Sequence, residues 1–319
     1  MNRLRLTALS GAAVLALGLA ACGDSGDTGG SSSDGASLSG TIRIDGSSTV
    51  GPLTEAAAEA FQGENSGVRV TVGTSGTGGG FEKFCAGETD ISDASREIED
   101  DEIAACRDRG ITYESFQVAN DGIAVVTNPE NDWARCLTVD QLRTIWNTGS
   151  KVASWKDVDG SFADEKLTLY GPGTDSGTFD FFTDKINGEE GASRSDYNAT
   201  EDDNVTVQGV SGDKGGLGYF GLSYYEQNRD KLQAVEVDSG RGCVAPSTET
   251  VQDGSYTPLS RPLFIYVKAD SLRKPEVEAF VEYYLANTVD LAEQALFVPL
   301  TDEQQAELQP KLDSLKSGT

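Results

Sequence analysis

Three times along this chain, a short apolar strand pattern is followed by a loop rich in Gly, Ser and Thr and then by a helical pattern. The first loop spans residues 45–52, the second 73–80 and the third 171–178. Apolar residues recur at helical spacing after each loop, as Leu53 and Ala57 do after the first. Strands that alternate with helices are typical of parallel sheets covered by helices. The sequence therefore predicts an α/β fold with mainly parallel sheets.

Each loop also has the composition of an anion-binding site. A helix N-terminus presents unpaired N–H groups and a partial positive charge, and glycine lets the backbone approach an anion closely. Ser and Thr hydroxyls add donors that need no formal charge. None of the loops continues into Gly-Lys-Ser or Gly-Lys-Thr, so none matches the P-loop. One such loop is usually an ordinary capped turn, but three favour a cleft in which helix ends converge on one oxyanion.

The N-terminus has the order of a secretory signal. Arg3 and Arg5 precede an apolar run that ends at Ala21, shorter than the ~20 residues that a spanning helix needs. The ending Leu-Ala-Ala-Cys resembles the bacterial lipobox, in which Cys22 is acylated after cleavage of residues 1–21. We therefore expect a lipid anchor at the outer face of the bacterial cell membrane. Residues 22–39, mostly Gly, Ser and Asp, would form a flexible tether.

Charge and composition exclude several classes of function. The formal net charge is −27, and removal of the two signal arginines makes it −29 (−27 − 2). So acidic a chain is a poor partner for nucleic acid or anionic lipid headgroups. The sequence contains no histidine, which excludes a Ser-His-Asp triad, histidine metal ligands and a histidine general base. An oxygen-ligand metal site and a carboxylate-pair hydrolase stay open on composition alone, although we expect neither enzymatic activity nor a metal or cofactor.

The length indicates two lobes. The 280 residues that follow the tether (319 − 39) exceed the size at which a single core keeps growing. Apolar β-type runs at 122–127 and 263–267 are well placed to cross between the lobes. We expect lobe I to comprise residues 40–115 and 264–319, and lobe II to comprise residues 116–263.

Four cysteines remain after Cys22, an even number in an oxidising compartment, which indicates two disulfides. No CxxC spacing occurs, and this argues against a zinc site. Four cysteines allow three connectivities. We expect Cys85–Cys106 and Cys136–Cys243, because each of these bridges joins residues placed in the same lobe.

Four motifs occur in an order that resembles a known family: DGSSTV at 45–50, GTSG at 73–76, DISDASR at 90–96 and GTDSGTF at 173–179. The chain is similar to the phosphate-binding protein of the bacterial high-affinity phosphate ABC importer. SRSDY at 193–197 and GVSGDK at 209–214 are typical of one branch of that family. The resemblance implies a two-lobed periplasmic-binding-protein fold with the ligand cleft between the lobes. It also implies a monomeric receptor that delivers inorganic phosphate to a membrane permease.

The resemblance implies the phosphate ligands as well. The three loops would supply hydroxyl and amide donors from Ser48, Thr49, Val50, Ser75, Ser176, Gly177 and Thr178. The family's buried carboxylate matches Asp93, which would accept a hydrogen bond from the P–OH that sulfate lacks. Some members place an arginine four residues before the serine of the third loop, where this chain has Pro172. We therefore expect Arg96 to supply the main positive charge, with Arg194 second, and an adjacent arginine to lower the pKa of Asp93.

Three alternatives stay open. The receptor could bind another oxyanion, such as sulfate or molybdate. A secreted phosphohydrolase would use Ser176 or Thr178 as its nucleophile, although the missing histidine argues against it. An adhesin or other surface module would bind no small ligand at all.

Overall fold

The computed structural model describes residues 37–318. The signal segment, the acylation site expected at Cys22 and most of the expected tether lie outside the described residues. Within residues 37–318, no helix is both long enough and apolar enough to cross a membrane.

A nine-stranded mixed sheet forms the framework of the described chain. Its strand order is β2-β1-β3-β12-β4-β8-β6-β7, with β9 paired to β4. The strands are β1 (Gly40–Gly46), β2 (Val68–Gly73), β3 (Ile91–Ala94), β4 (Tyr113–Thr127), β6 (Thr168–Gly171), β7 (Asn198–Ala199), β8 (Gly216–Gly221), β9 (Gln233–Ala234) and β12 (Ser260–Lys268). A second sheet has the order β11-β10-β5, from β5 (Cys136–Thr138), β10 (Glu236–Asp238) and β11 (Cys243–Val244).

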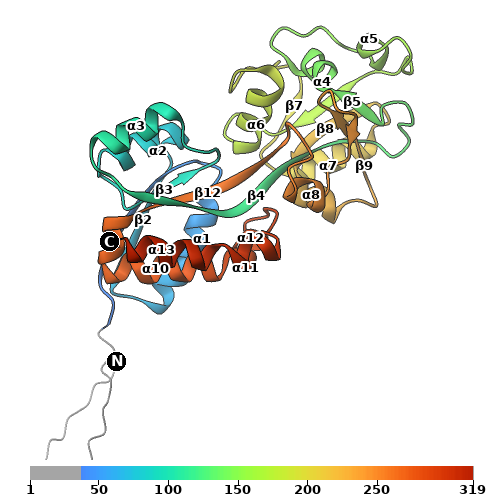
Figure 1. Ribbon diagram of the computed structural model, residues 1–319. Helices are drawn as coiled ribbons and strands as arrows, with labels where there is room; N and C mark the ends of the chain where they lie inside the picture. Colours follow the sequence, from blue (N-terminus) through green and yellow to red (C-terminus); the bar gives the residue numbers. More distant parts are fainter. Residues whose placement is uncertain (1–36, 319) are drawn as a thin grey trace, which may run out of the picture. The chain divides into compact units, whose positions relative to one another are not determined.

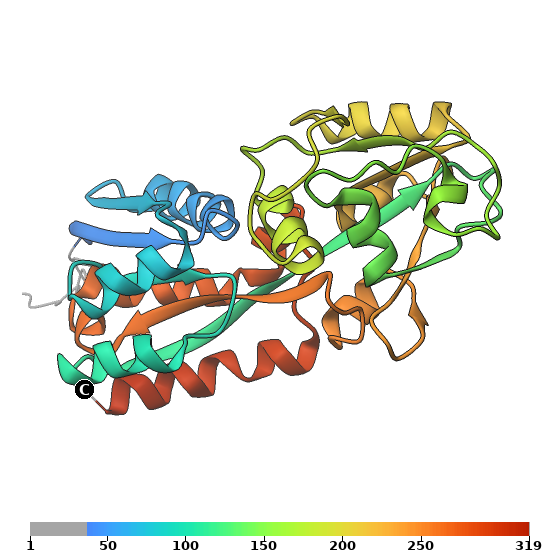
Figure 2. The same cartoon turned by 90° about the horizontal axis from the view of Figure 1, so that it is seen from above.

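Parallel pairing is confined to the two ends of the large sheet. β1 pairs in parallel with β2 and β3, and β6 pairs in parallel with β7 and β8. Between these ends, β4 and β12 run antiparallel to each other and to their outer neighbours β8 and β3. Their pairing extends from Ser260 opposite Gly122 to Lys268 opposite Tyr113. The two long strands lie side by side in both Figure 1 and Figure 2 and join the parallel ends.

Helices fill the connections between strands. They are α1 (Gly51–Glu64), α2 (Gly76–Cys85), α3 (Asp100–Asp108), α4 (Val139–Trp146), α5 (Trp155–Val158), α6 (Gly177–Phe182), α7 (Asp203–Gly212), α8 (Leu222–Gln227), α9 (Thr248–Gln252), α10 (Pro275–Ala286), α11 (Thr288–Gln294), α12 (Asp302–Ala306) and α13 (Leu308–Ser317). A π-helix (Thr183–Asn187) continues α6, and a 3₁₀-helix (Ala269–Arg273) precedes α10. Each of the three Gly/Ser/Thr loops leads into a helix, namely α1, α2 and α6.

The chain forms separate hydrophobic cores along the sheet. Alternate residues of β12 face opposite sides, as the period of a strand requires. Leu263 and Ile265 join a core with α1, α10 and α13, whereas Phe264 and Tyr266 pack against α2 and α3 on the other face. Figure 1 shows these two helical layers on either side of the strands. A further core gathers the C-terminal half of β4 with β6, β8, α4 and α7.

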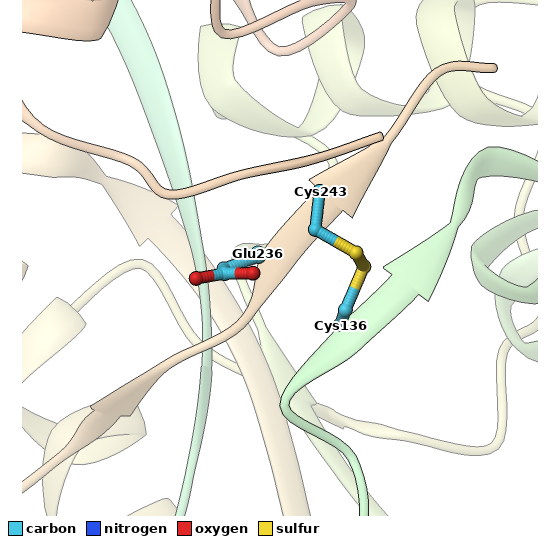
Figure 3. A group of neighbouring side chains, drawn as sticks. All are labelled: Cys136, Glu236 and Cys243. Atoms are coloured by element: carbon cyan, nitrogen blue, oxygen red, sulfur yellow. A yellow bond between two sulfur atoms is a disulfide. The ribbon is translucent and has the colours of Figure 1, made fainter. Parts of the chain in front are cut away.

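Two disulfides connect the pairs expected from the sequence. Cys85 at the end of α2 is bonded to Cys106 in α3, and Cys136 in β5 is bonded to Cys243 in β11. Figure 3 shows the second bridge beside Glu236, whose carboxylate lies within 4.8 Å of both sulfur atoms. Because metal binding needs a thiolate and these sulfurs are bonded to each other, this group is a disulfide and not a metal site.

Candidate functional site

A cavity of about 780 Å³ collects residues from all three Gly/Ser/Thr loops. The first loop contributes Ser48 and Thr49, the start of α2 contributes Thr77, and the start of α6 contributes Gly177. Residues that follow β3, the first residues of β12 and residues of α6 and the segment after it also line the cavity. Loops that lie up to 132 residues apart in the chain (177 − 45) therefore face one space.

The first loop is held by its own backbone contacts and by a neighbouring strand. The Ser47 amide donates to the carbonyl of Asp93 at 2.9 Å, and the Ser47 hydroxyl accepts from the Thr49 amide at 3.2 Å. Pro52 stands in the first turn of α1, where its missing N–H costs nothing. Ser48 and Thr49 consequently line the cavity, whereas the side chain of Val50 is buried in the first core.

The third loop meets the first. Ser176 caps α6, its hydroxyl accepting from the Thr178 amide at 3.2 Å. Gly177 lines the cavity, and a Cβ at this position would lie 2.9 Å from Thr49 Oγ1. Glycine is therefore what allows the start of α6 to approach the first loop. Ser176 and Thr178, both half-buried, do not belong to the cavity lining.

In the second loop, the structure directs a different hydroxyl into the cavity from the one expected. The Ser75 hydroxyl and amide both donate to the carboxylate of Asp45, which also accepts from Lys83 Nζ at 2.6 Å. Burial alone would raise the pKa of Asp45, but the hydrogen bonds from Lys83 and Ser75 lower it. Thr77 lines the cavity instead, with its hydroxyl 3.2 Å from that of Ser95.

Asp93 is fully buried on β3, and neither carboxylate oxygen has a hydrogen-bond partner. Burial raises its pKa from 3.8 to about 8, with a smaller rise from the charges of Asp45 and Glu55. The nearby Thr54 hydroxyl lowers the pKa of Asp93 in part, but that hydroxyl lies 3.0 Å from Tyr284 Oη and does not form a hydrogen bond to the carboxylate. Our expectation of a lowered pKa beside an arginine is wrong, because desolvation dominates and the charges that act on Asp93 are acidic.

Arg96 lines the cavity, but carboxylates already occupy its guanidinium. Nη1 and Nη2 each donate to Glu102 at 2.8 Å, and Nε lies 3.3 Å from Glu99. The hydrogen bonds that Arg96 donates to Glu102 are the main reason that its pKa is raised. The positive charge of Arg96 is thus balanced within its own neighbourhood.

Arg194 lies away from the cavity that the three loops share. Its Nε and Nη2 donate to Asp196 at 2.7 and 2.9 Å, and Nη1 donates to the carbonyls of Ile145 and Val152 at 3.1 and 3.0 Å. It lines a second cavity of about 510 Å³. The carbonyl of Ile145 belongs to the last turn of α4, and a guanidinium that bonds such a carbonyl stabilises the helix. The structure therefore does not bring Arg194 together with the other expected ligands.

Arg261, which the sequence analysis did not single out, reaches the cavity from the start of β12. Its Nε donates to Asp121 Oδ2 at 3.0 Å, and its Nη2 donates to Thr49 Oγ1 at 2.9 Å. The guanidinium carbon stands 3.8 Å from the ring centre of Phe181 in α6. Nothing in the local pattern Ser-Arg-Pro marks this residue, because it begins a strand and belongs to none of the loops.

Acidic side chains form much of the remaining lining: Glu97, Glu99, Asp180, Asp184 and Glu190. Against them the cavity holds Arg96, Lys185 and Arg261. Burial and the charge of Glu190 raise the pKa of Asp180. An anion would thus be drawn by local donors rather than by the field of the whole chain. Among the lining hydroxyls, those of Thr77 and Ser95 bond each other and that of Thr49 accepts from Arg261, an arrangement suited to binding rather than to activating a nucleophile.

Comparisons with known proteins agree over nearly the whole chain. A family model described as a PBP superfamily domain matches residues 31–288. Protein SphX of Synechocystis sp. is 47% identical over 294 residues, which are 91% of this chain and 84% of the relative. The phosphate-binding protein PstS of Staphylococcus saprophyticus is 42% identical over 300 residues, 93% of this chain and 90% of the relative. The solved structure of a possible phosphate binding protein from Planctomyces limnophilus has a TM-score of 0.85 at 47% identity, covering 88% of this chain and all of that one.

Proposed function

Since this chain belongs to the family of PstS and SphX proteins, we propose that it captures inorganic phosphate outside the cytoplasm and delivers it to an ABC permease. The observation that carries the proposal is the convergence of three Gly/Ser/Thr loops on one cavity. Amide and hydroxyl donors of this kind suit a tetrahedral oxyanion. The protein is a receptor and not an enzyme, and it acts as a monomer.

The ligand set follows from the cavity and the neighbouring loops. Ser48, Thr49, Gly177 and the Val50 amide lie at or beside the lining, and Thr77 joins them. Ser75, Ser176 and Thr178 would reach the anion only after the loops rearrange on closure. Arg96 contributes positive charge from one wall. Asp93, once it has lost its proton, accepts the hydrogen bond of a P–OH behind the first loop, to whose backbone its carbonyl is already bonded.

Binding would be accompanied by hinge closure. We propose lobe I as residues 40–115 and 264–319 and lobe II as residues 116–263. The separate cores and the two long strands between them support this division. A bound anion contacts loops from both lobes and so stabilises the closed state. Five residues depart from this segmentation. Val298 packs in the core around β8 although it lies near the C-terminus, and the core around α1 and α10 includes Phe116, Val118, Ala119 and Leu263.

A lipid anchor at Cys22 would hold the receptor beside its permease. The proposal rests on the signal-like residues 1–21 and the Gly/Ser-rich segment that follows. Cys22→Ala should leave an uncleaved or misplaced precursor. Detergent partitioning of the variant and the parent checks this, and normal membrane attachment of the variant would refute it.

A thermal-shift panel of phosphate, arsenate, sulfate and molybdate tests the ligand. A ligand at 100 times its dissociation constant should stabilise the native state by about 2.7 kcal/mol. Phosphate and arsenate should both raise the melting temperature, whereas sulfate should not. A shift with sulfate or molybdate alone would assign the receptor to another oxyanion. Turnover of p-nitrophenyl phosphate would instead indicate a phosphohydrolase.

A further inference from the structure

We propose that Arg261 is the guanidinium that binds the anion and supplies its main positive charge. The proposal deepens the proposed function and depends on it. Arg261 reaches the shared cavity from β12, a strand that contributes none of the three loops. It thereby provides the positive charge that an arginine in the third loop would supply, at the position where this chain has Pro172.

The position of the guanidinium favours contact with whatever the loops bind. One nitrogen bonds Thr49 of the first loop, and the guanidinium carbon lies over Phe181, one turn into the helix that follows the third loop. A Cβ at Gly177 would lie 2.9 Å from the same Thr49 hydroxyl. Arg261, the first loop and the start of α6 therefore meet at one point of the cavity.

The guanidinium also has unused donors. Arginine carries five N–H bonds, and Arg261 uses one for Asp121 and one for Thr49. Within the described residues, three of its N–H bonds (5 − 2) therefore remain to donate to a ligand. Arg96, by contrast, is held by Glu102 through both terminal nitrogens, and Arg194 uses all three of its nitrogens on Asp196 and backbone carbonyls.

Asp121 and Phe181 would orient the charge before the anion arrives. The Arg261 side chain is 15% exposed and that of Asp121 is 10% exposed, so their contact is largely shielded from water. A stacked, ion-paired guanidinium loses little freedom on binding and presents its remaining N–H groups as a fixed fork. Two parallel N–H···O bonds to an oxyanion need this geometry, which a lysine ammonium does not have.

The experiment measures phosphate affinity by titration calorimetry in the parent, Arg261→Gln, Arg261→Lys and Arg96→Gln. Loss of a charged hydrogen-bond donor should weaken binding about 10- to 100-fold for Arg261→Gln. Arg261→Lys should still bind phosphate clearly more weakly than the parent, because lysine restores the positive charge but not the planar pair of N–H donors. Arg96→Gln should weaken binding less than Arg261→Gln does. Arg107→Gln, which removes the same charge from an exposed surface position, is the matched control.

Melting temperatures without phosphate separate binding from folding. If Arg261 were only structural, Arg261→Gln would lower the melting temperature and leave the phosphate-induced shift unchanged. That result would overturn the inference. So would a phosphate affinity equal to the parent's in Arg261→Gln together with a strongly reduced affinity in Arg96→Gln. If Arg261→Gln fails to fold, parental affinity in Arg261→Lys would overturn it equally. A parent that binds no phosphate would instead refute the proposed function, so the two failures are distinguishable.

Discussion

Replacing Asp93 by Asn should make the empty protein's stability less sensitive to pH. The parent side chain is 0% exposed, its oxygens have no hydrogen-bond partner, and burial raises its pKa to about 8. In an unfolded chain, the same carboxyl titrates near its ordinary value of 3.8. An amide of nearly the same shape carries no proton that titrates in this range, so the variant removes this linkage while keeping the volume.

The sign follows from proton counting. Below about pH 4 the carboxyl is protonated in both states, so it contributes no pH dependence to stability. Between about pH 4 and pH 8 the unfolded chain has lost the proton while the folded protein keeps it. Stability therefore falls as pH rises, by about 1.4 kcal/mol per pH unit. The loss levels off above about pH 8, at no more than about 6 kcal/mol for the shift from 3.8 to about 8.

Urea unfolding in phosphate-free buffer at pH 5, 6, 7 and 8 measures this difference. The free energy of unfolding of Asp93→Asn, minus that of the parent, should become larger at each higher pH. Asp230→Asn, at an exposed position, is the control and should show no such trend. If the difference between Asp93→Asn and the parent is the same at all four pH values, Asp93 does not hold its proton in the folded protein. The reasoning from burial would then be refuted.

Four further outcomes are expected. Above about pH 8, where Asp93 is ionised and can only accept, Asp93→Asn should narrow the preference for phosphate over sulfate, because an amide can donate to an oxyanion. Sulfate competing no better against the variant than against the parent at that pH would contradict this. Asp90→Asn should destabilise most at neutral pH. Burial would raise the pKa of Asp90, but hydrogen bonds led by that from Lys274 lower it, so its stabilising contribution is lost as pH falls through the lowered pKa. If urea unfolding shows that the loss of unfolding free energy in Asp90→Asn is the same in acid as at neutral pH, the Asp90–Lys274 ion pair does not stabilise the protein. Replacing Cys136 and Cys243 together by Ser should cost ~2–5 kcal/mol of unfolding free energy without abolishing phosphate binding. The rate of phosphate association in stopped flow should rise with salt, because salt screens the acidic lining and the net charge of −27; a fall would show that steering by the local cations dominates.

Much of the site could be predicted from the sequence because it is encoded locally. A loop of Gly, Ser and Thr between a strand and a helix places N–H and hydroxyl donors at a helix N-terminus, whatever the rest of the chain does. The fold class follows from the same alternation of strands and helices. Within a loop, however, the pattern could not choose between Ser75 and Thr77. That choice depends on Asp45 and Lys83, which draw Ser75 out of the lining.

Only the tertiary structure decided which charges meet the cavity. Arg261 contacts Thr49 across 212 positions of sequence and Asp121 across 140, so no local pattern could connect them. The antiparallel pairing of β4 with β12 brings Arg261 beside Asp121. Burial likewise sets the protonation of Asp93, and burial is a sum over distant segments. The sequence by itself determined the donors, because helix ends and hydroxyls are local. The sheet determined the charges around them, because long-range strand pairing alone fixes which ions are neighbours and which are shielded from water.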